Sequence, residues 1–192
     1  MDGREDETLD NGESSYHRFL KGDTDGLTEL VDAYYDSLVL YLDTILHNIQ
    51  DAEDCAEETI IVLTTKKPVF RGSSSFKTWL FSIGRNLARK RLKSERFTVS
   101  VPTNDLDGVM LSEQDVAGDY LVDEEKKILY KCLQNLKPLY REIVWLKFFE
   151  EMPMKDIAKT TGKTVYSVKH MASRALDALR MEMRKKGYYE RS

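Results

Sequence analysis

Five side chains able to contact DNA are spaced along one predicted helix in the C-terminal part of the chain. They are Tyr166, Lys169, His170, Ser173 and Arg174. Lys and Arg donate hydrogen bonds to bases and phosphates, and smaller polar groups add contacts to base edges. We identify Lys169, His170, Ser173 and Arg174 as candidate base-reading residues. A solvated helix surface is the better interpretation of His170 or Ser173 taken singly, whereas Lys169 and Arg174 are stronger candidates.

The segment around these residues has the spacing of a helix-turn-helix. Ala158 is small where two helices would touch, and Gly162, four positions on, permits the positive φ of a tight turn. Four apolar residues are expected to supply the shared core: Ile157, Val165, Val168 and Ala172. We expect a recognition helix and its continuation over residues 165–184. Other helical hairpins that contain an Ala and a Gly share this spacing, so the motif alone leaves DNA binding open.

A second candidate surface is a basic helix predicted over residues 76–93. Ser75 is a natural N-cap for it. One face of the helix is apolar and contains Phe76, Trp79, Leu80, Ile83 and Leu87. Its other positions are largely polar or basic and include Lys77, Ser82, Arg85, Asn86, Arg89 and Lys93. Because Trp79 shares the apolar face, we predict that it packs in the core rather than stacking on a base.

The formal net charge of −4 hides a strong division along the chain. Residues 65–97 hold ten Lys or Arg against one acid, residues 104–125 hold eight acids and no base, and residues 155–186 hold nine bases against three acids. Charge blocks determine local binding more than net charge does. The break in pattern between residues 100 and 118, rich in Pro, Gly, Asn and Asp, predicts a linker between two domains.

The remaining hydrophobic periodicity predicts helices and no strands. Helices are expected at residues 27–49, 52–64 with Asp51 as N-cap, 76–93, 123–148 with a pause at Pro138, and 154–184. The fold class is therefore all-α, with two small helical domains joined by a flexible acidic linker, the second containing the helix-turn-helix. The expected divisions are an acidic disordered tail at 1–14, a first domain at 15–98, the linker at 99–122 and a second domain at 123–188.

Several classes of protein find no support in the sequence. There is no phosphate-binding glycine loop, no HExxH and no nucleophile beside a base, so we expect no enzyme, no catalytic residue, no cofactor and no small-molecule substrate. Cys55 and Cys132 stand alone and the three histidines are scattered, which argues against a metal site. No apolar run is long enough to span a bilayer, and the first residues are acidic, so we expect a cytoplasmic protein without membrane insertion.

Three blocks in order resemble a known family: DAEDCAEET, FRGSSSFKTWLFSIGRNLARKRLK and LKPLYREIVWLKFFEEMPMKDIAKTTGKTVYSVKHMASRALDALR. Over about residues 17–97 and 124–182 the chain resembles RNA polymerase sigma factors of the extracytoplasmic-function (ECF) type. The resemblance implies a transcription initiation factor that binds the clamp and flap of core RNA polymerase, directs it to minus-35/minus-10 promoters and helps melt the DNA. It assigns the minus-10 element to the first domain (region 2) and the minus-35 element to the second (region 4).

The resemblance also implies roles for individual residues. Core polymerase binding falls on the acids Asp51, Glu53, Asp54, Glu57 and Glu58. Minus-10 binding falls on a pocket for a flipped base at Phe70 and Asn86, and on phosphate contacts by Lys77, Arg85, Arg89, Lys90 and Lys93. Minus-35 binding falls on Lys169, His170, Ser173 and Arg174. The chain departs from the family at Met171, where a basic residue is common, and at residues 60–65, which lack the frequent aromatic side chain.

Two other functions remain open at this stage. One is a helix-turn-helix regulator that binds duplex DNA alone, usually as a dimer, without core polymerase. The other is a degenerate sigma-like protein that binds polymerase or a partner and starts no transcripts. An anti-sigma factor is a further partner that the family implies, although no residue of this chain identifies one.

Overall fold

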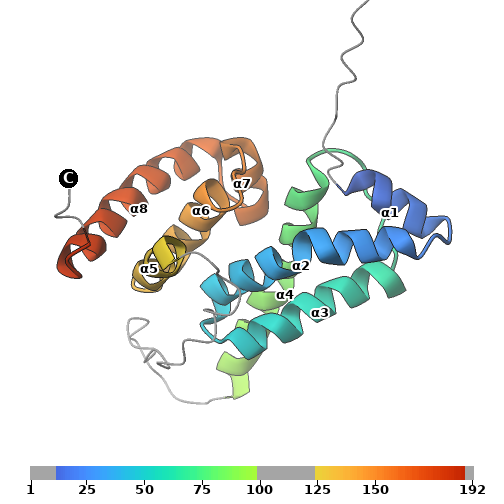
Figure 1. Ribbon diagram of the computed structural model, residues 1–192, viewed down its shortest axis with the longest axis horizontal. Helices are drawn as coiled ribbons and strands as arrows, with labels where there is room; N and C mark the ends of the chain where they lie inside the picture. The colour runs from blue at the N-terminus through green and yellow to red at the C-terminus, as the bar shows by residue number, and fades with distance from the viewer. Residues whose placement is uncertain (1–11, 99–123, 189–192) are drawn as a thin grey trace, which may run out of the picture.

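The computed structural model describes residues 12–98 and 124–188, which form eight helices and no strand (Figure 1). The N-terminal domain contains α1 (Glu13–Leu20), α2 (Asp25–Leu46), α3 (Ile49–Thr65) and α4 (Phe76–Thr98). The C-terminal domain contains α5 (Glu124–Leu133), α6 (Pro138–Phe148), α7 (Met154–Thr161) and α8 (Val165–Lys185). The predicted all-α class is confirmed, while the predicted linker at 99–122 lies outside the described residues.

The junction between α2 and α3 is tighter than the sequence pattern predicts. His47 ends α2 in the left-handed region at φ 56°, and the Asn48 side chain then accepts from the backbone N–H groups of Gln50 and Asp51 at 3.0 and 3.2 Å. Asn48 is therefore the N-cap of α3, and the prediction that Asp51 caps it is wrong. Asp51 lies instead in the first turn, where its charge favours the helix dipole.

Helix α4 is fixed at its start by a cap and by aromatic packing. The Ser75 hydroxyl accepts from the Thr78 N–H at 3.2 Å, which confirms the predicted N-cap. Phe76 and Trp79 pack their rings 5.4 Å apart and contact Tyr16 of α1. Trp79 is thus partly buried and packs against the core cluster, as the apolar face predicts.

One glycine explains how closely α4 approaches its neighbours. A Cβ atom at Gly84 would lie 3.1 Å from Leu38 Cδ1 of α2 and 3.2 Å from Thr59 Oγ1 of α3. Glycine inside a helix usually destabilises it, so close packing is the physical reason for this residue.

Helix α1 is absent from the sequence prediction, which places residues 1–14 in an acidic tail. The helix begins at Glu13 and packs against α2. Its eight residues are too few for hydrophobic periodicity to stand out, although Tyr16 is fully buried. The Tyr16 hydroxyl donates to the Pro68 carbonyl at 2.8 Å and so ties α1 to the loop before α4.

The C-terminal domain contains the predicted helix-turn-helix. Gly162 ends α7 at φ 66°, and the Thr164 hydroxyl accepts from the Ser167 N–H at 3.1 Å to cap α8. Ile157, Val168 and Ala172 are buried between the helices as predicted. The prediction for Val165 is wrong: it is 39% exposed, because it begins α8 at the edge of the turn.

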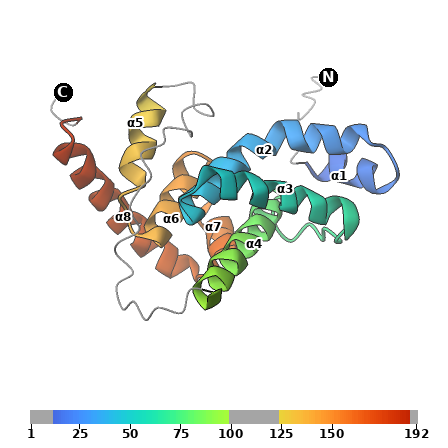
Figure 2. The same cartoon turned by 90° about the horizontal axis from the view of Figure 1, so that it is seen from below.

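The two domains are in contact in this structure. Helix α6 packs on α2 and α7 packs on α4, as the two views in Figures 1 and 2 show. The outer face of α8 points away from the N-terminal domain (Figure 1). Within the described residues, no helix is both long and apolar enough to cross a membrane.

Candidate nucleic-acid interface

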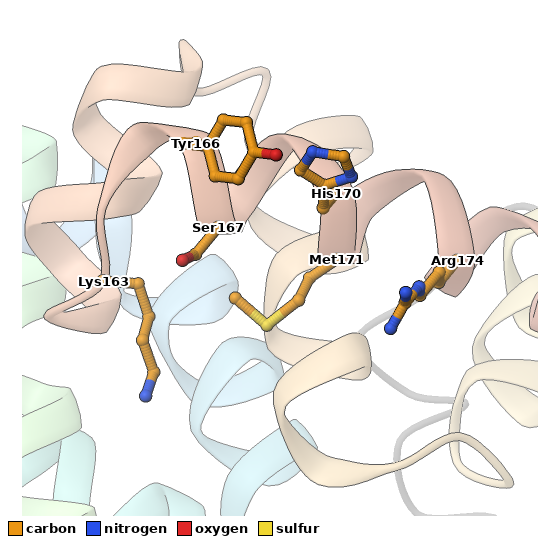
Figure 3. Close-up of a pocket in the computed structure, with 6 residues that line it drawn as sticks. All are labelled: Lys163, Tyr166, Ser167, His170, Met171 and Arg174. Carbon is orange, nitrogen blue, oxygen red and sulfur yellow. The ribbon is translucent and has the colours of Figure 1, made fainter.

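The start of α8 carries a shallow hollow on its exposed face. Six residues line it: Lys163, Tyr166, Ser167, His170, Met171 and Arg174. Figure 3 shows Lys163 and Arg174 at opposite ends of the hollow with Met171 between them. Two cations and a polarizable thioether are thus presented together along the first three turns of α8, and the helix dipole adds positive potential at the N-terminal end.

An aromatic pair stands beside this hollow. Tyr166 is 73% exposed, and its ring meets the His170 ring edge to face with 4.4 Å between centroids. The two rings stand next to each other in Figure 3. Residues four apart on a helix are neighbours on its surface, which brings the two rings together.

The four predicted minus-35 residues, Lys169, His170, Ser173 and Arg174, are all exposed on α8. His170 and Arg174 also line the hollow. Lys163, Ser167 and Met171 are not among the residues predicted for this surface. The helical register gives the signal that could have found them, since positions 163, 167, 171 and 174 follow a three-and-four spacing on one side of the helix.

Helix α4 presents a second polar face. Asn86, Arg89, Lys90 and Lys93 are exposed along it. They follow the predicted alternation of packed and polar faces, because Ala88, between them in sequence, is fully buried. A row of exposed cations on one helix suits the regular spacing of a nucleic-acid backbone.

Two other predicted minus-10 residues, Phe70 and Lys77, are engaged within the protein. Phe70 is 7% exposed, and its ring lies 5.6 Å from Phe76 and 5.2 Å from Trp79. Lys77 Nζ lies 2.6 Å from Glu150 Oε2 of the C-terminal domain. Stacking by Phe70 therefore stays a prediction that needs its ring to leave this cluster.

Arg85 is the most enclosed of the predicted DNA contacts. Its Nε donates to Glu142 Oε2 at 2.5 Å and its Nη2 donates to Glu142 Oε1 at 3.4 Å. Arg85 and Glu142 are 4% and 5% exposed. Burial alone would lower the Arg85 pKa, but the charge of Glu142 and its hydrogen bonds outweigh burial and raise that pKa. Arg85 is therefore held in its charged form against the Glu142 carboxyl group.

The predicted polymerase-binding acids lie on α3. Asp54, Glu57 and Glu58 are exposed, whereas Asp51 and Glu53 are half-buried. Two of the five acids are already in ion pairs, which Arg91 of α4 makes with Asp51 at 2.8 Å and with Asp54 at 3.1 Å. These pairs fix α3 against α4, and the exposed acids leave α3 with an acidic outer surface.

No cluster of three or more His, Cys, Asp or Glu side chains suited to a metal ion occurs in the part of the chain that the structure describes. Cys55 and Cys132 are free and buried. Burial raises the pKa of the Cys55 thiol to about 12, so it is held as the unreactive neutral form.

Two family models match the chain. Sigma-70 region 2 matches residues 30–98, and sigma-70, region 4 matches residues 126–179. The first match ends with α4, and the second contains α6, α7 and most of α8. The two matched segments therefore contain both candidate DNA-binding helices.

Curated relatives match over most of this chain. The ECF RNA polymerase sigma factor SigW of Bacillus subtilis is 27% identical over 172 residues, covering 85% of this chain and 92% of the relative. RNA polymerase sigma factor YlaC of the same organism is 27% identical, covering 87% of this chain and 97% of the relative. The ECF sigma factor RpoE of Cereibacter sphaeroides is 29% identical, covering 69% and 72%.

Two solved structures share the fold. The sigma factor RpoE in complex with the anti-sigma factor NepR from Bartonella quintana superposes with a TM-score of 0.67 at 19% identity, covering 88% of this chain and 99% of that chain. CnrH in complex with the cytosolic domain of CnrY superposes with a TM-score of 0.64 at 18% identity, covering 92% and 99%.

Proposed function

This chain belongs to the sigma-70 family, in the ECF group of RNA polymerase sigma factors, and we propose that α8 and α4 divide promoter recognition between them. As a sigma factor it binds core RNA polymerase and promoter DNA. In this division α8 reads the minus-35 element and α4 holds the minus-10 element. We further propose that the chain has no catalytic activity of its own and works in the cytoplasm with the polymerase.

The observation that carries the minus-35 assignment is the exposed polar face of α8. Lys169, His170, Ser173 and Arg174 project from the first turns of a capped helix in a helix-turn-helix. Such a helix enters the major groove with its N-terminal residues against base edges. Lys163, at one end of the hollow, is suited to a phosphate, and Tyr166 to the apolar edge of a thymine.

The minus-10 assignment is supported by the exposed row on α4. Arg89, Lys90 and Lys93 would hold phosphates, and Asn86 offers the amide that a flipped base needs for edge hydrogen bonds. Phe70 would supply the stacking surface in this proposal. Extrusion of a base costs a few kcal/mol, which stacking and hydrogen bonding in such a pocket offset without ATP.

The acidic surface of α3 is proposed to bind the clamp of the largest polymerase subunit. Asp54, Glu57 and Glu58 are exposed there, and Ile61, one turn further on, is 54% exposed. An exposed apolar side chain within a charged patch suits a protein partner, because apolar contact adds affinity to electrostatic steering. The flap of the polymerase is the expected partner of the C-terminal domain.

An anti-sigma factor is a further proposed partner. One structural relative was solved with the anti-sigma factor NepR and another with the cytosolic domain of CnrY. We propose that a protein inhibitor of this kind binds the present chain as well.

Run-off transcription tests the proposed function. Purified core polymerase and a library of genomic promoter fragments are incubated with and without the full chain. We expect chain-dependent transcripts whose upstream sequences share a two-part element. Specific binding of duplex DNA by the free chain, with no dependent transcript, would instead favour a stand-alone helix-turn-helix regulator.

A further inference from the structure

The two domains meet across a surface that is charged and buried at its centre. Arg85 of α4 and Tyr41 of α2 both donate to the Glu142 carboxylate of α6, Tyr41 at 3.5 Å. Lys77 of α4 is held by Glu150, which follows α6, through both its carboxylate and its backbone carbonyl. Each of these contacts joins one domain to the other, so each exists only while the domains are together.

A second polar group joins the end of α2 to α5 and α6. The Asp43 carboxylate accepts from the Tyr130 hydroxyl and from Gln134 Nε2, the latter at 3.1 Å. Arg141 Nε donates to the Thr44 carbonyl at 3.0 Å. Asp43 and Arg141 are 6% and 3% exposed. The interface therefore encloses charges of both signs along its length.

An interface of this composition is suited to opening. A buried ion pair gains attraction but loses hydration. The paired state and the separated state therefore differ less in free energy than the short distances between the charges suggest. Contacts between domains of one chain commonly resemble transient interfaces. Closure is nevertheless favoured because it is intramolecular, at an effective concentration on the order of millimolar.

We propose that this closed arrangement is an autoinhibited state, in which carboxylates of the C-terminal domain occupy the place of promoter phosphates on α4. Arg85 and Lys77 cannot hold a carboxylate and a phosphate at the same time. The domains must therefore separate at α4 before this helix can bind DNA with all its cations. The inference rests on the proposed role of α4 and adds an intramolecular competitor to it.

The test compares Glu142→Gln with the matched control Asp177→Asn in the full-length chain. Both substitutions convert an acid of the C-terminal domain to its amide and remove one negative charge. Asp177 is the control because it lies on α8 in an exposed ion pair with Arg180 of the same helix. Small-angle X-ray scattering gives the radius of gyration. Fluorescence anisotropy gives the affinity for labelled single-stranded oligo(dT), which presents phosphates without promoter sequence.

We expect opening in Glu142→Gln, because Arg85 then faces a neutral amide in a buried site. The radius of gyration should rise, and the affinity for oligo(dT) should rise by roughly tenfold or more. Two released cations should steepen the dependence of log affinity on log salt by about 1.4, at about 0.7 for each phosphate contact to a single strand. Asp177→Asn should keep the radius and the salt dependence of the parent.

Tyr130→Phe is a milder variant that guards against misfolding. It removes only the hydroxyl that donates to Asp43 and keeps the ring packed on Trp145, so it should shift both readouts in the same direction by less. Far-ultraviolet circular dichroism must match the parent in each variant. A radius and an affinity that stay at parent values in both Glu142→Gln and Tyr130→Phe would overturn the proposal.

Two other outcomes separate the inference from the proposed function. A larger radius with unchanged oligo(dT) affinity would overturn the competition between carboxylate and phosphate. In the Glu142→Gln background, adding Arg89→Ala should lower the affinity. If the radius and the affinity rise in Glu142→Gln but Arg89→Ala has no effect, α4 is not the DNA-binding surface, and the proposed function fails while domain opening stands.

Discussion

The two helices proposed to bind DNA are presented very differently. On α8 the predicted contacts are exposed, and the surface is complete within one domain. Its cap and turn come from α7 and α8, and its core also includes α6. On α4 part of the predicted contact set is exposed, while Arg85 is buried against the C-terminal domain. The first surface is available in the free chain, and the second is completed only by a change in domain arrangement.

This difference fits the tasks proposed for the two surfaces. Reading duplex DNA in the major groove needs a rigid helix with exposed side chains and no change in the protein. Holding a melted strand needs a pocket for an extruded base and a row of cations that would otherwise bind any nucleic acid. An intramolecular acid on those cations lowers nonspecific binding by the free chain, and binding to polymerase would be the natural occasion for release.

The largest effect that would sharpen this comparison is expected at Asn86. Asn86→Ala removes the amide proposed to bond a flipped base, a contact of about 1–3 kcal/mol, so the melted fraction should fall about tenfold or more. Initial binding should change little, since Asn86 carries no charge. Permanganate footprinting measures melting, and electrophoretic retardation of the holoenzyme complex at low temperature measures initial binding. An unaltered footprint would show that the base pocket is assigned wrongly.

A somewhat smaller effect is expected on α8. Arg174→Ala should reduce discrimination among minus-35 variants by about tenfold, the loss of one hydrogen-bonded contact to a base edge. The radius of gyration should stay that of the parent, because the Arg174 side chain is exposed. Holoenzyme binding to duplexes with single minus-35 substitutions measures the discrimination.

Arg180→Ala is the matched control for Arg174→Ala. Arg180 lies on the same helix beyond the hollow, in an exposed pair with Asp177. Its loss should weaken all duplexes alike, if it weakens them at all. If the Arg174→Ala variant discriminates among minus-35 sequences as the parent does, the contact is misassigned. The exposed face of α8 would then not contain all the predicted minus-35 contacts.

The sequence predicts the exposed surfaces of both helices better than it predicts what covers them. Alternation of apolar and polar residues places Asn86, Arg89 and Lys93 outside and Trp79 in the core, because that pattern depends only on neighbours within one helix. The burial of Arg85 depends on Glu142, 57 positions away, and on Tyr41, 101 positions from Glu142. Periodicity within a helix contains no signal for such a pair.

The errors at helix ends have a similar cause. Asp51 is a good N-cap by residue type, but His47 takes a left-handed conformation that lets α3 begin at once, so Asn48 becomes the cap. A non-glycine residue in that region is uncommon and is not read from residue type. Met171, where a basic residue is common in the family, lies in the hollow beside His170, a position that agrees with its helical register.

A moderate effect is expected from mild acid, acting through His47. Burial of the imidazole, followed by the charge of Arg141, lowers the His47 pKa to about 4 from its usual 6.5. The closed state therefore holds the ring neutral, and a freed ring binds a proton as pH falls below 6.5. The equilibrium constant for closure should fall by several fold between about pH 6.5 and 5. This is less than the limit of tenfold per pH unit for one titrating group, because solvent partly screens the ring.

Two buried carboxyl groups of the domain interface set the lower edge of that window. Burial raises the pKa of Asp43, against the hydrogen bonds that lower it, and burial likewise raises the pKa of Glu150. Protonation of these two carboxyls favours the closed state and opposes the effect of His47 as pH approaches their titration range. Arg141 stays protonated throughout the window. Scattering from pH 7.5 to 5 should show a rising radius of gyration.

His47→Asn is the control for the pH experiment, because Asn accepts a left-handed conformation and binds no proton. Its radius should be nearly constant over the same range. If the variant and the parent respond to pH identically, His47 does not gate the interface, and the comparison between the two helices would need another trigger.

The smallest expected difference separates two lysines of α4. Lys90 is exposed, whereas Lys77 is paired with Glu150 across the interface. In the free chain, Lys90→Ala removes an available cation and should lower the oligo(dT) affinity by about twofold to fivefold, with a salt slope smaller by about 0.7. Lys77→Ala should lower neither the affinity nor the salt slope, because the Lys77 ammonium is already paired with Glu150.

The same pair of substitutions in the Glu142→Gln background tests whether Lys77 becomes available to DNA when the domains open. Once the domains are open, Lys77→Ala and Lys90→Ala should lower the oligo(dT) affinity to similar extents. Lys77→Ala alone should disturb closure little, because Glu150 keeps the bond from Trp145 Nε1 at 3.0 Å and burial raises its pKa toward the neutral form. Equal losses for the two lysines in the parent chain would mean that DNA reaches Lys77 in the closed state. In that case α4 would be as available as α8, and the difference between the two helices would carry no regulation.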